Sequence, residues 1–126
     1  GRGLIVAPSI TMTWAEAAYH DYLVSSKEAQ LARDYLAERQ ITPQTIADYG
    51  IGFAPNEWQW LADRAEREGQ SAEILKAIGV LGMSEKGRVY DTFRGRVLFP
   101  IRDPSKRPIA FGGRILPSYT EEVTAK

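Results

Sequence analysis

Residues 86–114 read KGRVYDTFRGRVLFPIRDPSKRPIAFGGR, and the fold class depends on this stretch. Upstream of it, apolar residues recur at helical spacing. Within it, the short apolar runs at 97–101 and 108–111 are typical of β-strands. The turn-forming sequence DPSKR at 103–107 joins these two runs. We therefore expect an antiparallel hairpin.

Residues 88–91 predict an additional strand beside this hairpin. Pro100 and Pro108 lack the N–H that a central strand donates, so we expect a sheet edge or a strand end at both positions. Together with the helical patterns upstream, this predicts an α+β fold, with N-terminal helices followed by a small antiparallel sheet. A chain of this length forms one domain, expected over 13–126 behind an arm or linker at 1–12.

Capping signals divide the N-terminal part into helices. The expected helices and their caps are Thr13 to about Val24, Ser25-Ser26 to about Arg39, Thr42-Pro43 to Gly50, Asn56 before 57–68, and Ser71 before 72–78. Residues 51–55 predict a short strand or an extended link. Helical spacing places Leu31 and Leu36 on one inward face, and we expect Ile46 and Tyr49 to point inward as well. In the expected helix 57–68, the apolar residues form one stripe of Trp58, Leu61, Ala62 and Ala65.

The stretch 86–114 is also strongly basic, with eight basic residues against two acidic ones, a net charge of +6. The whole chain has 16 basic and 16 acidic residues, so the remainder carries a net charge of −6. A positive field concentrated on one element attracts a polyanion and disfavours its binding elsewhere. Phosphate, in nucleic acid or in nucleotides, is the expected ligand.

The composition excludes several classes of site. The chain has no cysteine and a single histidine, His20, which excludes disulfides, thiolate metal sites and polyhistidine metal sites. His20 falls within a helical pattern, where we expect a surface or core position rather than catalysis. No apolar run approaches the roughly 20 residues that span a bilayer, and no signal peptide is recognisable, so we expect a cytoplasmic chain. The start at Gly1 without Met favours a piece of a longer protein.

The tripeptide Gly112-Gly113-Arg114 stands at an expected strand end. Adjacent glycines permit unusual backbone angles or a close approach of the main chain to a ligand, and the arginine after them can meet a phosphate. A bulge followed by a surface arginine is the alternative. Strand alternation gives Arg94, Arg96 and Arg102 one parity, so we expect these arginines to form a basic rim beside a packed core.

The neighbouring aromatic and acidic residues have two interpretations each. Tyr90 and Phe93 could stack nucleic-acid bases, but a core position is the better account. Asp91 and Asp103 lie among arginines, and we expect them to orient guanidinium groups through bidentate pairs rather than to bind Mg²⁺. Residues 28–49 have the outline of a helix-turn-helix, but its second helix carries no cation, so helix packing explains it better.

Four motifs together resemble the catalytic core of bacterial DnaG-type DNA primases. They are Tyr35-Leu36-x-x-Arg39, then Ile51-Gly52-Phe53-Ala54-Pro55 with Trp58, then Tyr90-Asp91-x-Phe93-Arg94-x-Arg96-Val97-Leu98-Phe99-Pro100-Ile101-Arg102-Asp103, and Phe111-Gly112-Gly113-Arg114. The resemblance covers roughly residues 14–126. It implies the N-terminal lobe of the primase RNA-polymerase domain, part of an enzyme that synthesises short RNA primers on single-stranded DNA during replication.

The resemblance also implies a basic groove that binds template and nucleotide phosphates. It assigns Arg39, Arg94, Arg114 and Lys126 to this groove, and the parity argument adds Arg96 and Arg102. The expected supporting residues are Tyr90, Asp91, Phe93, Asp103, Gly112 and Gly113. Two departures from the family pattern stand out. Gln40 replaces the usual Gly, and we expect it to alter the helix end that aims Arg39. Thr92 replaces a common Arg, which removes one cation from the groove.

The remaining implications concern cofactors and partners. In the family, Mg²⁺ or Mn²⁺ is bound by a TOPRIM lobe and Zn²⁺ by a further domain, and this sequence matches neither, so we expect no metal and no catalysis from this chain alone. The implied partners are single-stranded DNA template, RNA primer, nucleoside triphosphates and, through other parts of the protein, the replicative helicase. A monomer without membrane contact is expected. The alternative is a non-catalytic adaptor whose basic edge binds an acidic protein partner.

Overall fold

The computed structural model describes residues 2–117, with side chains for residues 10–117. Residue 1 and residues 118–126 lie outside the described part, and the predicted site residue Lys126 lies there with them. The elements are α1 (Arg2–Ser25), the 3₁₀ turn η1 (Lys27–Ala29), α2 (Gln30–Glu38), α3 (Pro43–Tyr49), β1 (Gly52–Ala54), α4 (Trp60–Arg67), α5 (Ala72–Ala77), β2 (Leu81–Met83), β3 (Val89–Asp91), β4 (Arg96–Arg102) and β5 (Pro108–Ile115).

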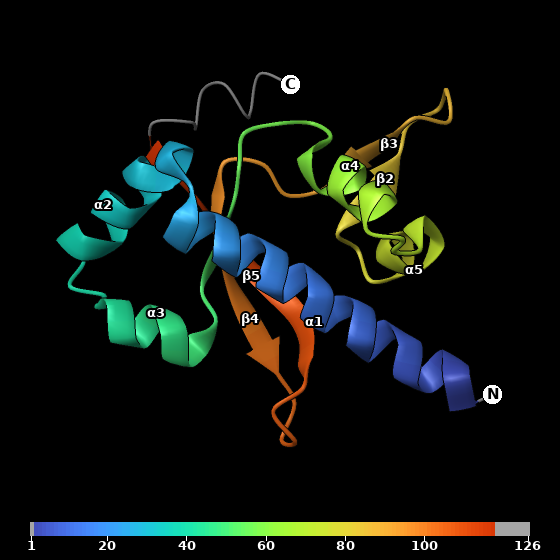
Figure 1. Cartoon of the computed structure of the whole chain (residues 1–126), viewed down its shortest axis with the longest axis horizontal. Helices are drawn as coiled ribbons and strands as arrows, with labels where there is room; N and C mark the ends of the chain where they lie inside the picture. The colour runs from blue at the N-terminus through green and yellow to red at the C-terminus, as the bar shows by residue number, and fades with distance from the viewer. Residues whose placement is uncertain (1, 118–126) are drawn as a thin grey trace.

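The chain folds as an α+β structure around a three-stranded antiparallel sheet in the order β1-β4-β5. Figure 1 shows α1 crossing this sheet, with α2 and α3 on one side of the molecule and α4, α5, β2 and β3 on the other. The expected hairpin is confirmed as β4 and β5. The expected additional strand is confirmed as β3, but it pairs with β2 in a separate two-stranded sheet, and the sequence had not predicted β2.

Helix α1 differs most from the expectation. Residues 2–12, expected as an arm or loop, are helical from Arg2 onward, and Met12 is buried. The expected cap at Thr13 is therefore wrong, because Thr13 lies in the middle of the helix. Glu16, expected to complete that capping box, instead pairs with Arg102 of β4 at 2.9 Å.

Three of the expected caps are confirmed. The side-chain oxygens of Ser26, Thr42 and Ser71 accept hydrogen bonds from main-chain N–H groups of the first turns that follow them. Gly50 ends α3 at a φ of 64°, a left-handed conformation that suits glycine. The inward positions expected for Leu31 and Tyr49 are wrong, because these side chains are 50% and 65% exposed. Helices this short bury only a narrow stripe.

Helix α4 begins later than expected. Asn56 was the expected cap of a helix over 57–68, but α4 starts at Trp60, and its N-cap residue Gln59 makes no side-chain capping hydrogen bond. Residues 55–59 form an irregular segment between β1 and α4. This segment carries Trp58, which the sequence had placed on the buried stripe of the helix.

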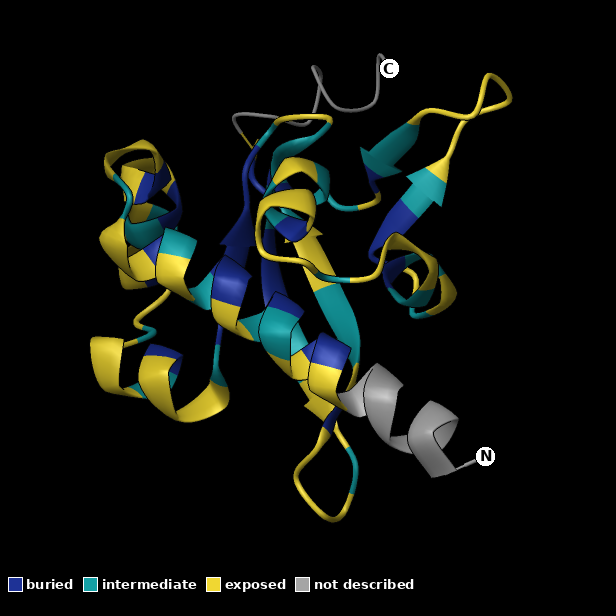
Figure 2. Cartoon of the chain, turned by 45° about the vertical axis from the view of Figure 1, so that its right-hand side comes forward, coloured by how far each residue is buried: buried dark blue, intermediate teal, exposed yellow. Residues whose placement is uncertain are grey.

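The core covers both faces of the central sheet. Val97 and Leu98, neighbours on β4 with opposite orientation, are both fully buried. Leu98 packs with residues of α1, α4 and α5, whereas Val97 packs with residues of α2, α3 and the end of α1. Figure 2 shows the buried residues on the faces of the elements that meet at the sheet, and the tip of the β4–β5 hairpin exposed. Helix α1 lies so close to β1 that a Cβ atom on Gly52 would come within 2.6 Å of Tyr19 Cβ.

Candidate nucleic-acid interface

Trp58, Tyr90 and Arg94 form a surface that we call the Trp58 stack. The Arg94 guanidinium carbon lies 3.7 Å from the centroid of the Trp58 ring, a close cation–π arrangement. Tyr90 of β3 meets Trp58 edge to face, with ring centroids 5.9 Å apart. Trp58 remains 39% exposed. The stack therefore offers solvent an aromatic surface and a cation side by side.

Two hydrogen bonds to the main chain of Asp91 connect Trp58 with Arg94. The Asp91 N–H donates to the Trp58 carbonyl at 2.7 Å. An Nη1 hydrogen of Arg94 is donated to the Asp91 carbonyl. Burial lowers the pKa of the Arg94 guanidinium from its ordinary value, and the nearby Asp91 carboxylate opposes this shift. An arginine keeps its charge through such shifts, so the stack carries a fixed positive charge.

Asp91 caps a helix, and the expected bidentate pair with an arginine is wrong for this residue. Its Oδ2 accepts a hydrogen bond from the Leu61 N–H at 2.8 Å, and its Oδ1 accepts one from the Ala62 N–H at 3.0 Å. These two N–H groups open α4, where helix geometry leaves them without main-chain partners. Asp91 is 1% exposed, and burial raises the pKa of its carboxyl to about 6 although the hydrogen bonds from α4 lower it.

A hollow of about 370 Å³ lies beside the stack, lined by Trp58, Gln59, Ser84, Arg88 and Tyr90. Arg88 is exposed, so a second cation stands next to the aromatic surface. Gln59 donates from Nε2 to the Val89 carbonyl at 2.9 Å, which ties the irregular segment 55–59 to β3. The hollow therefore lies between segment 55–59 and β3, which also carry Trp58 and Tyr90 of the stack.

The register of the sheet separates the arginines of the expected rim. Arg96 lies opposite Ile115 and Arg114 lies opposite Val97, and residues directly opposite in an antiparallel pair share a face. Arg96 and Arg114 therefore project from opposite faces, although both stand at the end of the sheet where β4 begins. Arg114 is exposed and Arg96 is half-buried.

Gly112 and Gly113 lie inside β5, so the strand end with unusual backbone angles expected here is wrong. Neither has a positive φ. A Cβ atom on Gly113 would lie 3.3 Å from Leu98 Cδ2 and 3.5 Å from Arg96 Cδ. Because Gly113 has no side chain, the side chains of Leu98 and Arg96 on β4 can lie against β5 at this position. Gly113 therefore has a role in packing.

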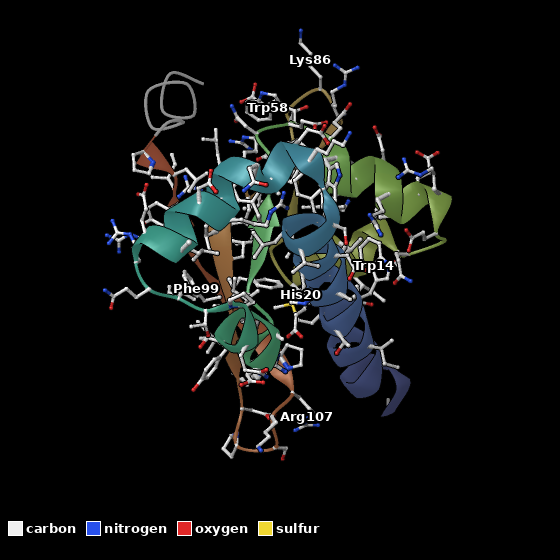
Figure 3. All side chains as sticks on the ribbon, turned by 60° about the vertical axis from the view of Figure 1, so that its left-hand side comes forward. Trp14, His20, Trp58, Lys86, Phe99 and Arg107 are labelled. Carbon is white, nitrogen blue, oxygen red and sulfur yellow. The ribbon has the colours of Figure 1, made fainter. Side chains whose placement is uncertain are left out.

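Arg102 and Arg39 lie away from the Trp58 stack. Arg102 pairs with Glu16 at the far end of β4, six residues or roughly 20 Å beyond Arg96. Arg39 follows α2, is exposed, and holds its guanidinium carbon 4.6 Å from the centroid of the Tyr35 ring. Figure 3 shows Trp58 and Lys86 at one end of the molecule and Arg107 at the other. The basic stretch 86–114 therefore does not form one continuous rim.

Two supporting residues have the surroundings that the sequence predicted. Phe93 packs against the core beside α1 and meets Phe111 edge to face at 6.1 Å. Asp103 pairs with Arg107 as expected, but through one oxygen: its Oδ2 accepts from Nε at 3.0 Å and lies 2.9 Å from Nη2, while its Oδ1 accepts from the Ser105 and Arg107 N–H groups. The hydrogen bond from the Arg107 N–H to Asp103 is the main cause that holds the pKa of this carboxyl below its usual range.

Sequence reasoning missed Trp58 and Arg88 as site residues. Trp58 was assigned to a helical stripe, because the spacing of Trp58, Leu61 and Ala65 fits a helix. The polar residues 56, 57 and 59 around Trp58 are the signal that could have placed it on the surface. Arg88 belonged to the basic stretch, but nothing in the sequence connected it to a tryptophan 30 residues earlier.

Neither a cluster of metal-binding side chains nor a membrane-spanning helix occurs among the described residues. No group of three or more His, Cys, Asp or Glu side chains in the described part could hold a metal. No helix within residues 2–117 is long and apolar enough to cross a membrane.

Comparison with known proteins identifies relatives over most of the chain. The family described as DNA primase catalytic core, N-terminal domain, matches residues 18–126. The DNA primase of Deinococcus radiodurans is 48% identical over 86 residues, which are 68% of this chain and 15% of that protein. The DNA primase of Escherichia coli strain K12 is 42% identical over 92 residues, 73% of this chain and 16% of that protein. The chain thus spans less than a fifth of the length of these relatives.

Solved structures agree with these matches. A DnaG primase catalytic domain bound to single-stranded DNA superimposes with a TM-score of 0.80 at 36% identity, over 91% of this chain and 37% of that one. The RNA polymerase domain of the Mycobacterium tuberculosis primase DnaG, in complex with a double-stranded DNA that has a 6-nucleotide overhang, gives a TM-score of 0.80 at 33% identity, over 89% and 35%.

Proposed function

Because the chain belongs to the family of DNA primase catalytic-core N-terminal domains, we propose that it holds the single-stranded template while a primase makes short RNA primers. The observation that carries this proposal is the Trp58 stack, in which Arg94 lies 3.7 Å from the Trp58 ring centroid beside Tyr90. A related catalytic domain has been solved bound to single-stranded DNA, which supports the choice of ligand.

The chemistry of the stack suits a single strand. Every base has an aromatic face, so stacking on Trp58 or Tyr90 tolerates any sequence and contributes about 1–3 kcal/mol per base. Arg94 and the exposed Arg88 supply charges for the phosphates between successive bases. A duplex hides its base faces, so this surface favours a single strand over a double one.

The other arginines have separate roles in the proposal. Arg114 and Arg96 stand on opposite faces at the end of the sheet where β4 begins, and Arg39 stands after α2. We assign Arg96 and Arg114 to phosphates of the template, the RNA primer or an incoming nucleoside triphosphate. Arg102 is neutralised by Glu16 and is not part of the proposed interface.

Primer synthesis is a phosphoryl transfer that needs metal ions to neutralise developing charge. The described residues do not fit a catalytic metal, because no acidic cluster gathers among them. In our proposal Mg²⁺ or Mn²⁺ is held by another part of the primase, and Zn²⁺ by a further domain. The Aquifex aeolicus primase has been solved with zinc-binding and RNA polymerase domains, at 27% identity and a TM-score of 0.75. Contact with the replicative helicase also belongs to other parts.

Fluorescence anisotropy with a labelled oligodeoxynucleotide of mixed sequence tests the proposal. We expect a Kd on the order of 10⁻⁴–10⁻⁶ M that weakens as salt rises. Arg94→Ala should raise the Kd roughly tenfold, since it removes both a phosphate contact and the partner of Trp58. Arg67→Ala is the matched control, because it removes the same charge from an exposed position at the far end of α4.

Two outcomes would contradict the proposed function. One is no binding by the unchanged chain at low salt. The other is equal loss of affinity in Arg94→Ala and Arg67→Ala, because net charge alone would then explain binding. Displacement of the strand by polyglutamate at equal charge concentration would favour an acidic protein partner instead.

A further inference from the structure

We propose that Asp91 is the positioning residue of the Trp58 stack, because its main chain and carboxylate together fix Trp58, Arg94 and the start of α4. This inference rests on the proposed function for its biological meaning. Its structural content concerns the arrangement of the stack itself and can be tested without any nucleic acid.

Three sets of hydrogen bonds converge on Asp91. Its N–H holds the Trp58 carbonyl at 2.7 Å, and its carbonyl accepts from Arg94. Its carboxylate accepts from the Leu61 and Ala62 N–H groups at 2.8 and 3.0 Å. Trp58 and Arg94, which form the cation–π contact and lie 36 positions apart in the chain, are therefore both hydrogen-bonded to Asp91. A change in the position of Asp91 must move both partners of the cation–π contact.

The carboxylate is the part of this arrangement that no other group replaces. The N-cap residue of α4, Gln59, makes no side-chain capping bond, because its amide is bonded to Val89. Without the carboxylate, the first N–H groups of α4 would be buried beside Leu61, which is fully buried, and would lack acceptors. The irregular segment 55–59 leads directly into the start of α4. The position of Trp58 in this segment therefore depends on the Asp91 carboxylate as well.

The charged and titratable groups that face the Asp91 carboxylate come from two segments. Tyr19 of α1 lies near it, and burial, with a smaller contribution from Asp91, holds the pKa of this phenol well above its usual value. Arg94 faces it from the segment between β3 and β4. Burial raises the pKa of Asp91 to about 6, so mild acid alone can remove the charge of the cap.

Nuclear magnetic resonance of Arg94 side-chain protons reads the stack directly. A guanidinium 3.7 Å from an indole centroid experiences a strong ring-current shift. We expect Asp91→Asn to move the Arg94 Hδ and Hε signals toward the values of a free arginine, since an amide offers one acceptor where the carboxylate offers two. Ser71→Ala is the matched control, because it removes the cap of the neighbouring helix α5 without touching the stack.

A pH titration of a chain that retains Asp91 supplies a second measurement in case Asp91→Asn does not fold. In a His20→Gln chain, which removes the single histidine, lowering the pH from 8 to 5 should shift the Arg94 signals with a midpoint near 6, because the guanidinium loses the negative charge that faces it. Arg94 signals that stay constant across this range would overturn the inference. So would an Arg94 shift in Ser71→Ala as large as the shift in Asp91→Asn.

Strand binding then separates positioning from general destabilisation. If Asp91→Asn lowers the population of the stacked arrangement to about one tenth, the apparent Kd for the oligodeoxynucleotide rises about tenfold. The same change should have less than about a twofold effect in an Arg94→Ala chain, since the contact it supports is already lost. An undiminished loss in the Arg94→Ala chain would overturn the inference. If the unchanged chain binds no DNA, the proposed function fails and the Arg94 signals still decide the role of Asp91.

Discussion

The buried Asp91 carboxyl should give the chain an unusual dependence of stability on pH. Its pKa is raised from 3.8 to about 6, so the folded chain holds this proton more tightly than the unfolded chain does. The contribution of Asp91 to the free energy of unfolding is then fully present below pH 4 and is lost as pH rises through 6. The slope is about −1.4 kcal/mol per pH unit within this window, and the full change is about 3 kcal/mol.

Urea denaturation at intervals between pH 4 and pH 8 measures this effect. Other carboxylates contribute to the total, so the useful quantity is the difference in unfolding free energy between the unchanged chain and Asp91→Asn, which cannot titrate. We expect this difference to change by about 3 kcal/mol in favour of the unchanged chain as pH falls from 7 to 4.

Asp103→Asn provides a control of opposite sign. The pKa of Asp103 is lowered, chiefly by the hydrogen bond from the Arg107 N–H, so its contribution to stability is present above its unfolded pKa and is lost as pH falls. A difference between the unchanged chain and Asp91→Asn that stays constant over the whole range would refute our account of Asp91. A difference with the sign expected for Asp103 would refute it as well.

Three further predictions follow from other parts of the structure. Gln40 and Lys106 have φ values of 64° and 66°, so Gln40→Gly and Lys106→Gly should each raise the free energy of unfolding by about 1 kcal/mol, and an unchanged urea midpoint in both would contradict this. Arg114→Ala should change the free energy of unfolding by less than about 0.5 kcal/mol, weaken single-strand binding evenly across sequences and reduce the slope of log affinity against log salt concentration by about 0.7. A drop of several degrees in Tm with unchanged DNA affinity would instead make this arginine structural. The 126-residue chain alone should make no oligoribonucleotides in a template-directed assay with Mg²⁺, because the described residues hold no acidic metal cluster, and any Mg²⁺-dependent product would contradict this.

Local signals in the sequence predicted local structure well. Thr42 and Ser71 cap helices as their spacing indicated, and Gly50 ends α3 in the left-handed conformation. The hairpin of β4 and β5 followed from two apolar runs and a turn. In each of these cases the interacting groups lie within a few residues of one another, so the sequence pattern contains the whole interaction.

The errors arose where distant residues decide the structure. Asn56 was a plausible cap by its local pattern, but Asp91 caps α4 from 30 residues away. That long-range cap delays the helix start and leaves Trp58 in an irregular segment, where it meets Arg94. Gly113 was expected at a strand end, whereas the register of β5 against β4 places it inside the strand, opposite Leu98. Pairing register and long-range capping are not visible in a single sequence.

The proposed site was therefore predictable only in part. Arg94 was named from the sequence as a phosphate-binding residue. Tyr90 was named only as a supporting residue for which a core position was the better account, although it is half-buried beside Trp58, and Trp58 was quoted in a motif but not assigned to the site. The parity of Arg94, Arg96 and Arg102 suggested one rim, yet the Glu16–Arg102 ion pair and the length of β4 remove Arg102 from it. The net charge of the stretch was informative about the kind of ligand and uninformative about where that ligand binds.

Photo-crosslinking tests the central claim most directly. An oligodeoxynucleotide carrying 5-iododeoxyuridine is irradiated in complex with the chain, and the crosslinked peptides are identified by mass spectrometry. A base stacked on an aromatic side chain reacts with it, so we predict crosslinks at Trp58 or Tyr90 that disappear in Arg94→Ala. Crosslinks confined to the exposed Tyr49 of α3, or crosslinks at Trp58 that persist undiminished in Arg94→Ala, would contradict the assignment of the Trp58 stack as the single-strand site.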